Sequence, residues 1–233
     1  TLVQKSASEV KAPLASRASM IASMAARPMF LTAARPKRTD PMALPGSTPV
    51  LAQSERMFAN AEASGRRIVD MVWEDLRPRR IMTAAAFENA VMVGLALSGS
   101  INLVRHLQAV AVEAGCPVDL YELYDRLGPK VPLLCAVRPN GETRIGELEA
   151  AGGTRGVMKR LESLLHLDAR TVDGRDWRAV LSEVKEVGEV VRPLDRPLSS
   201  RPSVVVMRGN LAPDGSILKL GNADAKTTLF RGK

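Results

Sequence analysis

The stretch LALSGSINLVRHLQAVAVEAG, residues 95–115, contains a polar break between two apolar helical patterns. The first pattern spans Ala84 to Leu97, and its nearly all-apolar composition predicts a helix that is buried on most sides. The second spans Asn102 to Ala114 and stops at Gly115, a residue suited to the left-handed end of a helix. Between them, Ser98-Gly99-Ser100 is either a plain turn between helices or a backbone opening where a polar ligand approaches. Composition and periodicity leave both interpretations open.

Four further helices are predicted from apolar spacing and capping residues. They span residues 54–76, 119–127, 142–151 and 155–165. Thr83 is the expected N-cap of the first apolar helix, and Asp119 with Glu122 forms a capping box for the short one. Gly152-Gly153 separates the last two helices, and Thr154 is the expected N-cap of the second.

Short β-type runs accompany these helices. The apolar run Val131–Val137 predicts a buried strand, and Asn140-Gly141 the turn that leaves it. Later runs of the same kind are Val190-Val191, Val204–Met207 and Ile217–Leu220, separated by Pro- and Gly-containing turns such as Ala212–Gly215. Short strands that alternate with helices predict an α/β layer architecture.

The overall composition is that of a soluble globular protein. With 233 residues and 45% apolar content the chain can build a sizeable core, although only 3% of the residues are aromatic. Charged residues interrupt every apolar run, so no membrane-spanning segment is predicted. Cys116 and Cys135 have no CxxC partner and predict neither a zinc site nor a disulfide framework, which makes the cytoplasm the expected location.

The positive charge is concentrated at the amino end. Residues 1–40 carry seven basic and two acidic side chains, a net +5 of the chain's +8. Prolines make residues 27–50 irregular, after a short amphipathic helix expected at Ser16–Ala26. A basic arm can bind phosphate backbones, but it lacks interleaved aromatic residues and a recognisable motif, so nucleic acid is not an expected partner. The composition also fits an organelle transit peptide or a solvated tail.

Few polar residues stand out as chemical groups. His106 and His166 lie 60 residues apart, and each is more typical of a structural histidine than a catalytic one. Asp70, Glu74 and Asp75 could hold a cation, although a solvated helix face beside arginines explains them better. The turn around Gly209-Asn210 lacks the lysine and following helix of a phosphate-binding loop, so a plain hairpin turn is preferred.

Several phrases, in this order, resemble the dihydroxy-acid and 6-phosphogluconate dehydratase family. They are LPGS (44–47), RRIMTAAAFENAVMVGLALSGSINLVRHLQAVAVEAG (79–115), VPLLCAVRPNGE (131–142), AGGTRGVMKRL (151–161), VVRPLDRPL (190–198) and RGNLAPDGSILK (208–219). The resemblance is collinear from Ala43 to Lys233, and the last two phrases look nearest to the sugar-acid branch, the arabinonate and xylonate dehydratases.

The resemblance implies a fold and an activity. Residues 43–190 would form the helix-rich later part of the family's N-terminal α/β domain, and residues 191–233 the first strands of a C-terminal β-barrel-like domain, after a basic arm of residues 1–42. The implied activity is that of a hydro-lyase, which converts a dihydroxy acid or sugar acid to a 2-keto-3-deoxy acid. In the family an iron–sulfur cluster acts beside Mg²⁺, and a serine removes the C2 proton.

This chain departs from the family at those catalytic groups. The phrases CDKxxPG and TDGRFSG are absent, and Ala12 stands where a cluster cysteine belongs. We therefore expect no catalytic or metal-binding residue, neither cofactor bound, and no activity from the chain alone. The alternative is a non-catalytic remnant that pairs with itself or with an intact homologue.

The break at residues 98–102 keeps part of a family phrase. The family has Gly-Gly-Ser-Thr-Asn where this chain has Ser98-Gly99-Ser100-Ile101-Asn102. The resemblance implies a tight junction near the substrate cavity, with Ser100 and Asn102 as polar lining, while Ile101 removes a hydroxyl group. A purely structural turn explains the same residues equally well.

Overall fold

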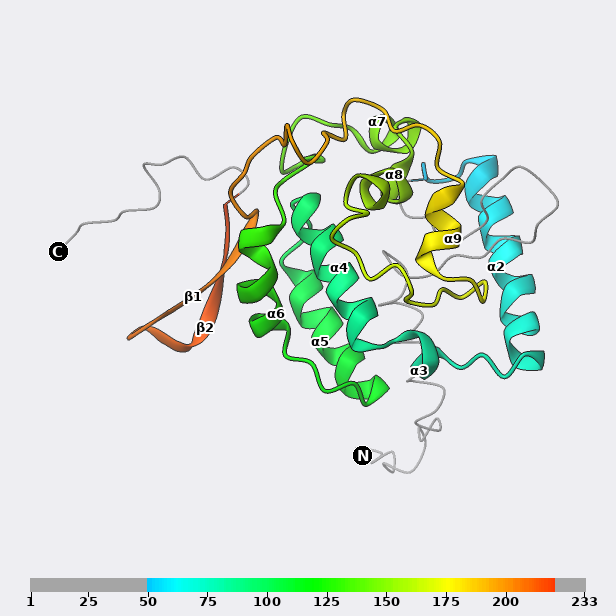
Figure 1. Ribbon diagram of the computed structural model, residues 1–233, viewed down its shortest axis with the longest axis horizontal. Helices are drawn as coiled ribbons and strands as arrows, with labels where there is room; N and C mark the ends of the chain where they lie inside the picture. The colour runs from blue at the N-terminus through cyan, green and yellow to red at the C-terminus, as the bar shows by residue number, and fades with distance from the viewer. Residues whose placement is uncertain (1–49, 221–233) are drawn as a thin grey trace, which may run out of the picture.

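The two apolar patterns on either side of the polar break form two packed helices. In the computed structural model, which describes residues 50–220, α4 spans Ala84–Ala96 and α5 spans Asn102–Ala114, as the sequence predicts (Figure 1). The Thr83 hydroxyl accepts a hydrogen bond from the Ala86 amide, and Gly115 ends α5 with φ of 70°. From Ala86 to Ala96 every α4 residue except Glu88 is buried, so α4 is the central helix of the core.

The other helices surround α4 and α5. They are α2 (Glu55–Trp73), α3 (Pro78–Ile81), α6 (Leu120–Leu127), the 3-10 turn η1 (Gly128–Lys130), α7 (Ile145–Ala150), α8 (Gly153–Arg160) and α9 (Trp177–Ser182). The Asp119 carboxylate accepts hydrogen bonds from the Tyr121 and Glu122 amides, which confirms it as the cap of α6. None of the helices in residues 50–220 is long and apolar enough to cross a membrane.

Helix α8 differs from its prediction at both ends. Gly152, with φ of 101°, precedes the first turn, so Thr154 lies inside the helix and is not its cap. The helix ends at Arg160, short of the predicted residue 165, because the buried Asn89 side chain of α4 binds the backbone of His166. Asn89 donates to the His166 carbonyl at 3.0 Å and accepts from the His166 amide at 2.8 Å. This tertiary contact overrides the local helical pattern.

The predicted strand at Val131–Val137 is wrong. The segment is almost entirely buried and extended, but it forms only isolated bridges, Leu133 with Ser199 and Val137 with Thr143. Its amides explain the difference, because those of Leu134 and Cys135 donate to the Ala96 carbonyl at 2.9 and 3.0 Å. Pro132 has no amide hydrogen to contribute to a ladder. The segment therefore pairs with the end of a helix where a strand would pair with a sheet.

The described β-structure is one antiparallel hairpin. Strand β1 (Val204–Gly209) pairs with β2 (Ala212–Lys219), and the hairpin stands at one side of the helices (Figure 1). The Ala212–Gly215 run predicted as a turn belongs to β2, where the register shifts and Gly215 takes φ of 110°, and the turn is Asn210-Leu211. Val190-Val191 is also a turn and forms no strand.

This mixture of helices and a small sheet is consistent with the α/β class. Val204 of β1 belongs to the same core cluster as α4 and α6. The division of the chain near residue 190 and the β-barrel-like domain stay predictions. The basic arm, the helix expected at 16–26, Ala12 and residues 221–233 lie outside the described residues.

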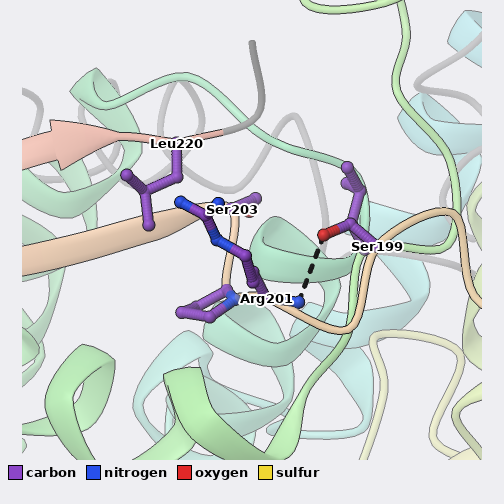
Figure 2. A pocket seen from close by; sticks show the side chains of 6 residues that line it. Ser199, Arg201, Ser203 and Leu220 are labelled. Carbon is purple, nitrogen blue, oxygen red and sulfur yellow. Dashed lines mark hydrogen bonds between the residues drawn. The ribbon is translucent and has the colours of Figure 1, made fainter. Parts of the chain in front are cut away.

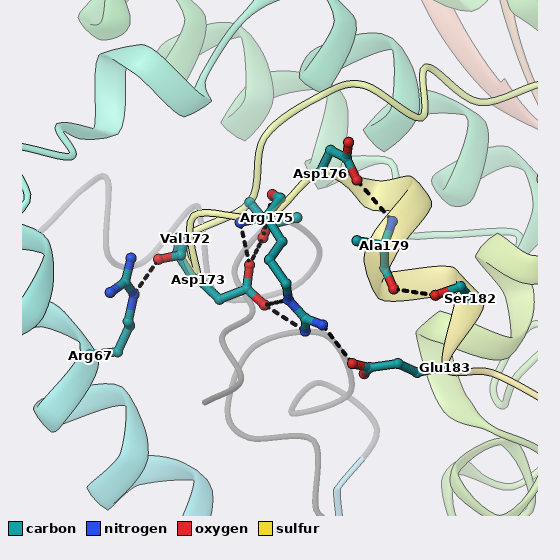
Figure 3. Close-up of polar contacts among 9 residues, drawn as sticks. Arg67, Val172, Asp173, Arg175, Asp176, Ala179, Ser182 and Glu183 are labelled. Atoms are coloured by element: carbon teal, nitrogen blue, oxygen red, sulfur yellow. Dashed lines mark hydrogen bonds and ion pairs between the residues drawn. The ribbon is translucent and has the colours of Figure 1, made fainter. Parts of the chain in front are cut away.

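Helix α2 is attached to the body through arginine contacts. Arg67 donates from Nε to the Val172 carbonyl at 2.5 Å, and its other two nitrogens bind the Glu74 carboxylate at 2.5 and 2.6 Å. Figure 3 shows Val172 in a turn that Asp173 and Arg175 hold, with Arg175 continuing to Glu183 at the end of α9. Arg67 therefore links the long α2 helix to the turn between α8 and α9.

The carboxyl end of α4 collects hydrogen bonds from several later segments. Besides the two amides on Ala96, the Ser203 hydroxyl donates to the Leu95 carbonyl at 2.6 Å. A helix leaves its last four carbonyls without internal partners. In this chain the amides directly after α4 bind the Val93, Gly94 and Leu95 carbonyls, while the segment after η1 supplies the donors for Ala96 and Ser203 adds a second donor for Leu95.

We expect Ser203→Ala to lower the free energy of unfolding by about 1 kcal/mol, because it removes a buried hydrogen bond between the hairpin and α4. Urea unfolding measures the loss. The matched control is Ser182→Ala, which removes an exposed bond to the Ala179 carbonyl and should change stability by less than about 0.5 kcal/mol. Equal effects of the two substitutions would contradict this account of the α4 end.

Candidate functional site

The polar break between α4 and α5 is a tight reversal of the chain. Ser98 adopts a left-handed conformation with φ of 51°, and the Gly99 amide donates to the Gly94 carbonyl at 2.8 Å, which closes α4. A Cβ atom on Gly99 would lie 3.2 Å from that carbonyl oxygen, so a small residue suits the position. Helix α5 then begins at Asn102. The N-cap residue is Ile101, whose side chain makes no capping hydrogen bond. The sequence -Ser-Gly-Ser- thus permits the reversal.

Two segments from far along the chain converge on this reversal. The Asn140 side-chain amide donates to the Ser98 carbonyl at 3.0 Å, and Lys219 Nζ donates to the Gly99 carbonyl at 2.8 Å. Asn140 belongs to the loop after the buried 131–137 segment, and Lys219 ends β2. Three of the family-like phrases, 79–115, 131–142 and 208–219, therefore meet at one place.

Lys219 has an unusual environment for a lysine. Burial lowers the pKa of its ammonium group, and within residues 50–220 no carboxylate pairs with it. The Ser98 hydroxyl is completely buried nearby in the reversal and has no hydrogen-bond partner in the described part of the chain. The reversal thus combines a partly buried cation with an unsatisfied hydroxyl group.

The predicted lining residues lie at the outer edge of this cluster. Ser100 and Asn102 are both exposed, and the Ser100 hydroxyl accepts a hydrogen bond from the Asn102 amide at 3.3 Å. Neither lines the two pockets found beside the cluster. Their role as substrate-pocket residues stays a prediction.

The two pockets lie on either side of the Leu133–Ser199 bridge. The larger, about 470 Å³, is an open hollow along the 139–143 loop that includes Asn140. The smaller, about 70 Å³, is lined in part by Ser199, Arg201, Ser203 and Leu220 (Figure 2). Arg201 donates its backbone amide to the Ser199 hydroxyl at 3.1 Å. The larger hollow includes Asn140, which binds the reversal, and the smaller includes Ser203, which binds the Leu95 carbonyl near the end of α4.

The loop that carries Asn140 depends on Gly141. A Cβ atom there would lie 2.4 Å from both Cβ and the carbonyl oxygen of Ala136, closer than real side chains approach. The same loop contains a cis peptide bond between Arg138 and Pro139. Close packing of the loop on Ala136 places the Asn140 amide on Ser98.

The remaining polar candidates form structural contacts. Glu74 pairs with Arg67, and Asp75 pairs with Arg77 and Arg80, which supports a surface of ion pairs and gives no sign of a cation site. His106 is exposed on α5. His166 Nε2 lies 2.8 Å from Glu88, which also binds Arg126.

The contact of His166 with Glu88 and Arg126 was not foreseen. Burial acts to raise the pKa of Glu88, but hydrogen bonds from Arg126 and His166 outweigh it and leave that pKa below its usual value. The three residues come from α4, α6 and the loop after α8, so their spacing in the sequence does not predict that their side chains meet. Lys219 was likewise missed, since its partner lies 120 residues earlier.

Comparison with known proteins decides the family. A model of the dihydroxy-acid/6-phosphogluconate dehydratase N-terminal region matches residues 41–180, more than half of the chain and including the whole reversal. The chain belongs to this dehydratase family. The resemblance of its phrases to the family is thereby confirmed.

Curated dehydratases cover most of the chain. A dihydroxy-acid dehydratase of Methanothermobacter thermautotrophicus is 43% identical over 77% of the chain and 33% of its own length. Those of Methanosarcina barkeri and Geobacter metallireducens are 38% and 42% identical over 82% of the chain, and 35% and 34% of their own lengths. The chain therefore spans about one third of the length of these relatives.

The cofactors implied for the dehydratase family do not fit the described residues. Within residues 50–220 no group of three His, Cys, Asp or Glu side chains could hold a metal ion. Burial raises the pKa of the Cys116 thiol, and it raises that of Cys135 despite a hydrogen bond with Thr143. Both thiols therefore disfavour the thiolate that ligates iron. No reaction step through a cluster or Mg²⁺ is assigned to these residues.

We expect Gly141→Ala to lower the free energy of unfolding by about 2 kcal/mol, because the new methyl group overlaps Ala136. Gly146→Ala is the matched control, since Gly146 lies in α7 with open space around it. Alanine there should be neutral or stabilise by up to about 1 kcal/mol. Chemical unfolding of both variants tests the loop geometry, and a neutral Gly141→Ala would contradict it.

Proposed function

We propose that this chain is part of a hydro-lyase that removes water from a dihydroxy acid to give a 2-keto-3-deoxy acid. The observation that carries the proposal is the family match over residues 41–180, together with relatives that all bear the name dihydroxy-acid dehydratase. A sugar acid, suggested by the phrases at 190–198 and 208–219, is the second candidate substrate.

Within residues 50–220, the reversal is the part best suited to hold such an acid. A dihydroxy acid has two hydroxyl groups and a carboxylate, which need hydrogen-bond donors, acceptors and a positive charge. Ser100 and Asn102 are exposed at the reversal, and Lys219 lies against it. We assign Ser100 and Asn102 to binding of the substrate's hydroxyl groups.

The chemical step itself is not assigned to residues 50–220. Loss of the C3 hydroxyl group requires an electrophile, and removal of the C2 proton requires a base. Within residues 50–220 no group of three His, Cys, Asp or Glu side chains could hold a metal ion as the electrophile, and we assign no described residue as the base. In this proposal the chain binds substrate within a larger assembly and has no turnover alone.

A chimera tests the proposal. The matching segment of the Geobacter metallireducens dihydroxy-acid dehydratase is replaced by this chain, and formation of keto acid from a dihydroxy acid and from arabinonate is measured. We expect turnover of the dihydroxy acid. Asn102→Ala should lower kcat/KM about tenfold or more through a lost substrate contact. Arg105→Ala, an exposed position in the same helix, should leave kcat/KM unchanged.

The outcomes separate the alternatives. A folded chimera without turnover would contradict the hydro-lyase proposal and favour a non-catalytic partner of an intact homologue, whose sign is co-purification with that homologue. If the chimera turns over arabinonate but not the dihydroxy acid, the proposed substrate would be a sugar acid. Turnover by the isolated chain would contradict its assignment as a binding part.

A further inference from the structure

Lys219 is a cation that the fold has left without an acidic partner in the described residues. Its ammonium group has one hydrogen-bond partner there, the Gly99 carbonyl at 2.8 Å. The other basic residue of the hairpin strands, Arg208, is neutralised by Asp125 of α6. The two cations of one hairpin therefore have opposite environments, and Lys219 is the more buried of the two.

Burial of this charge carries a folding cost. The pKa of Lys219 lies below its unfolded value because burial disfavours the charged form. A base with a depressed pKa binds protons less tightly in the folded state, so the folded state is disfavoured below the unfolded pKa near 10.5 and recovers as pH rises above the folded pKa. A single carbonyl dipole compensates only part of that cost, whereas a bound anion would compensate more.

Within residues 50–220, the contact recorded for the Lys219 ammonium group is the neutral Gly99 carbonyl, and no ion pair involves it. Ser98, beside Gly99, has a fully buried hydroxyl group without a partner in the described residues, and α5, whose first amide donates to the Ser100 hydroxyl, begins at the same reversal. A helix amino end favours negative charge. The loop that reaches Ser98 through Asn140 also carries Glu142, but the Glu142 side chain is 97% exposed and pairs with Arg138. Within residues 50–220, Lys219 therefore has a carbonyl oxygen but no carboxylate to balance its charge.

We propose that Lys219, at the reversal formed by Ser98-Gly99-Ser100, is the binding site for the carboxylate group of an organic acid. A lysine suits this role because its compact ammonium group on a flexible side chain can exchange the Gly99 carbonyl for a carboxylate, which is a stronger acceptor. The identity of the acid as a dihydroxy acid rests on the proposed function, with Ser100 and Asn102 beside Lys219 for its hydroxyl groups. The carboxylate site itself rests on the geometry of Lys219 alone.

Binding of three small probes to the full chain tests this site by NMR. Glycerate has both a carboxylate and two hydroxyl groups, propanoate has only the carboxylate, and glycerol has only hydroxyl groups. We expect glycerate to shift the backbone amide signals of residues 99–103 and 218–220 in a saturable way. Glycerol should bind about tenfold more weakly or worse, because it lacks the charge.

Variants separate charge from structure. Lys219→Gln retains an N–H donor for the Gly99 carbonyl and removes the charge, so the variant should stay folded and bind glycerate about tenfold more weakly. Lys219→Arg should retain binding. Lys185→Met, at an exposed lysine after α9, is the matched control and should bind as the parent chain does.

Each outcome bears on one part of the proposal. Equal affinity for glycerate and propanoate would support the carboxylate site and contradict recognition of a dihydroxy acid. Equal affinity for glycerate and glycerol, or undiminished binding by folded Lys219→Gln, would overturn the carboxylate site and leave the hydro-lyase proposal standing. Absence of saturable shifts with all three probes would also overturn the site.

Discussion

The fold depends on the unsatisfied carbonyl groups at the carboxyl end of α4. A helix cannot bond its own last carbonyls, and α4 ends deep in the core, where water cannot replace the missing donors. The amides directly after α4 bind the Val93, Gly94 and Leu95 carbonyls, and further donors come from two later segments. Leu134 and Cys135 bind Ala96, and Ser203 binds Leu95. The extended segment and the hairpin are thereby held against the helices.

The same requirement builds the candidate site. The Ser98 and Gly99 carbonyls of the reversal after α4 accept hydrogen bonds from Asn140 and Lys219, which come from the two segments that α4 already anchors. In our proposal, Lys219 both satisfies a backbone carbonyl and recognises a ligand, so one side chain serves both purposes. A helix without the Ser-Gly-Ser break would be easier to build, but it would offer no carbonyls for those side chains. The break is both a structural turn and, in our proposal, a place for a substrate.

Local chemistry made part of this structure predictable. Thr83, Asp119 and Gly115 act within a few residues of themselves, so their roles as helix ends followed from the sequence. The 131–137 segment did not follow, because apolar composition indicates burial but does not say which acceptor its amides use. The contacts of Asn89 with His166 and of Lys219 with Gly99 join residues 77 and 120 positions apart. At the candidate site, the sequence therefore indicated the reversal, and the roles of Ser100 and Asn102 stay predictions. It did not indicate Lys219, which binds Gly99.

Native-state hydrogen exchange tests the central claim that the α4 end organises the later segments. Leu134 and Cys135 lie in a segment that does not pair with a neighbouring strand. Only burial and the hydrogen bonds to the Ala96 carbonyl therefore protect their amides from exchange. We predict that they exchange as slowly as the core amides of α4, and that low urea concentrations accelerate all of them together. Exchange of Leu134 and Cys135 at the rate of exposed loops, while α4 stays protected, would contradict the account.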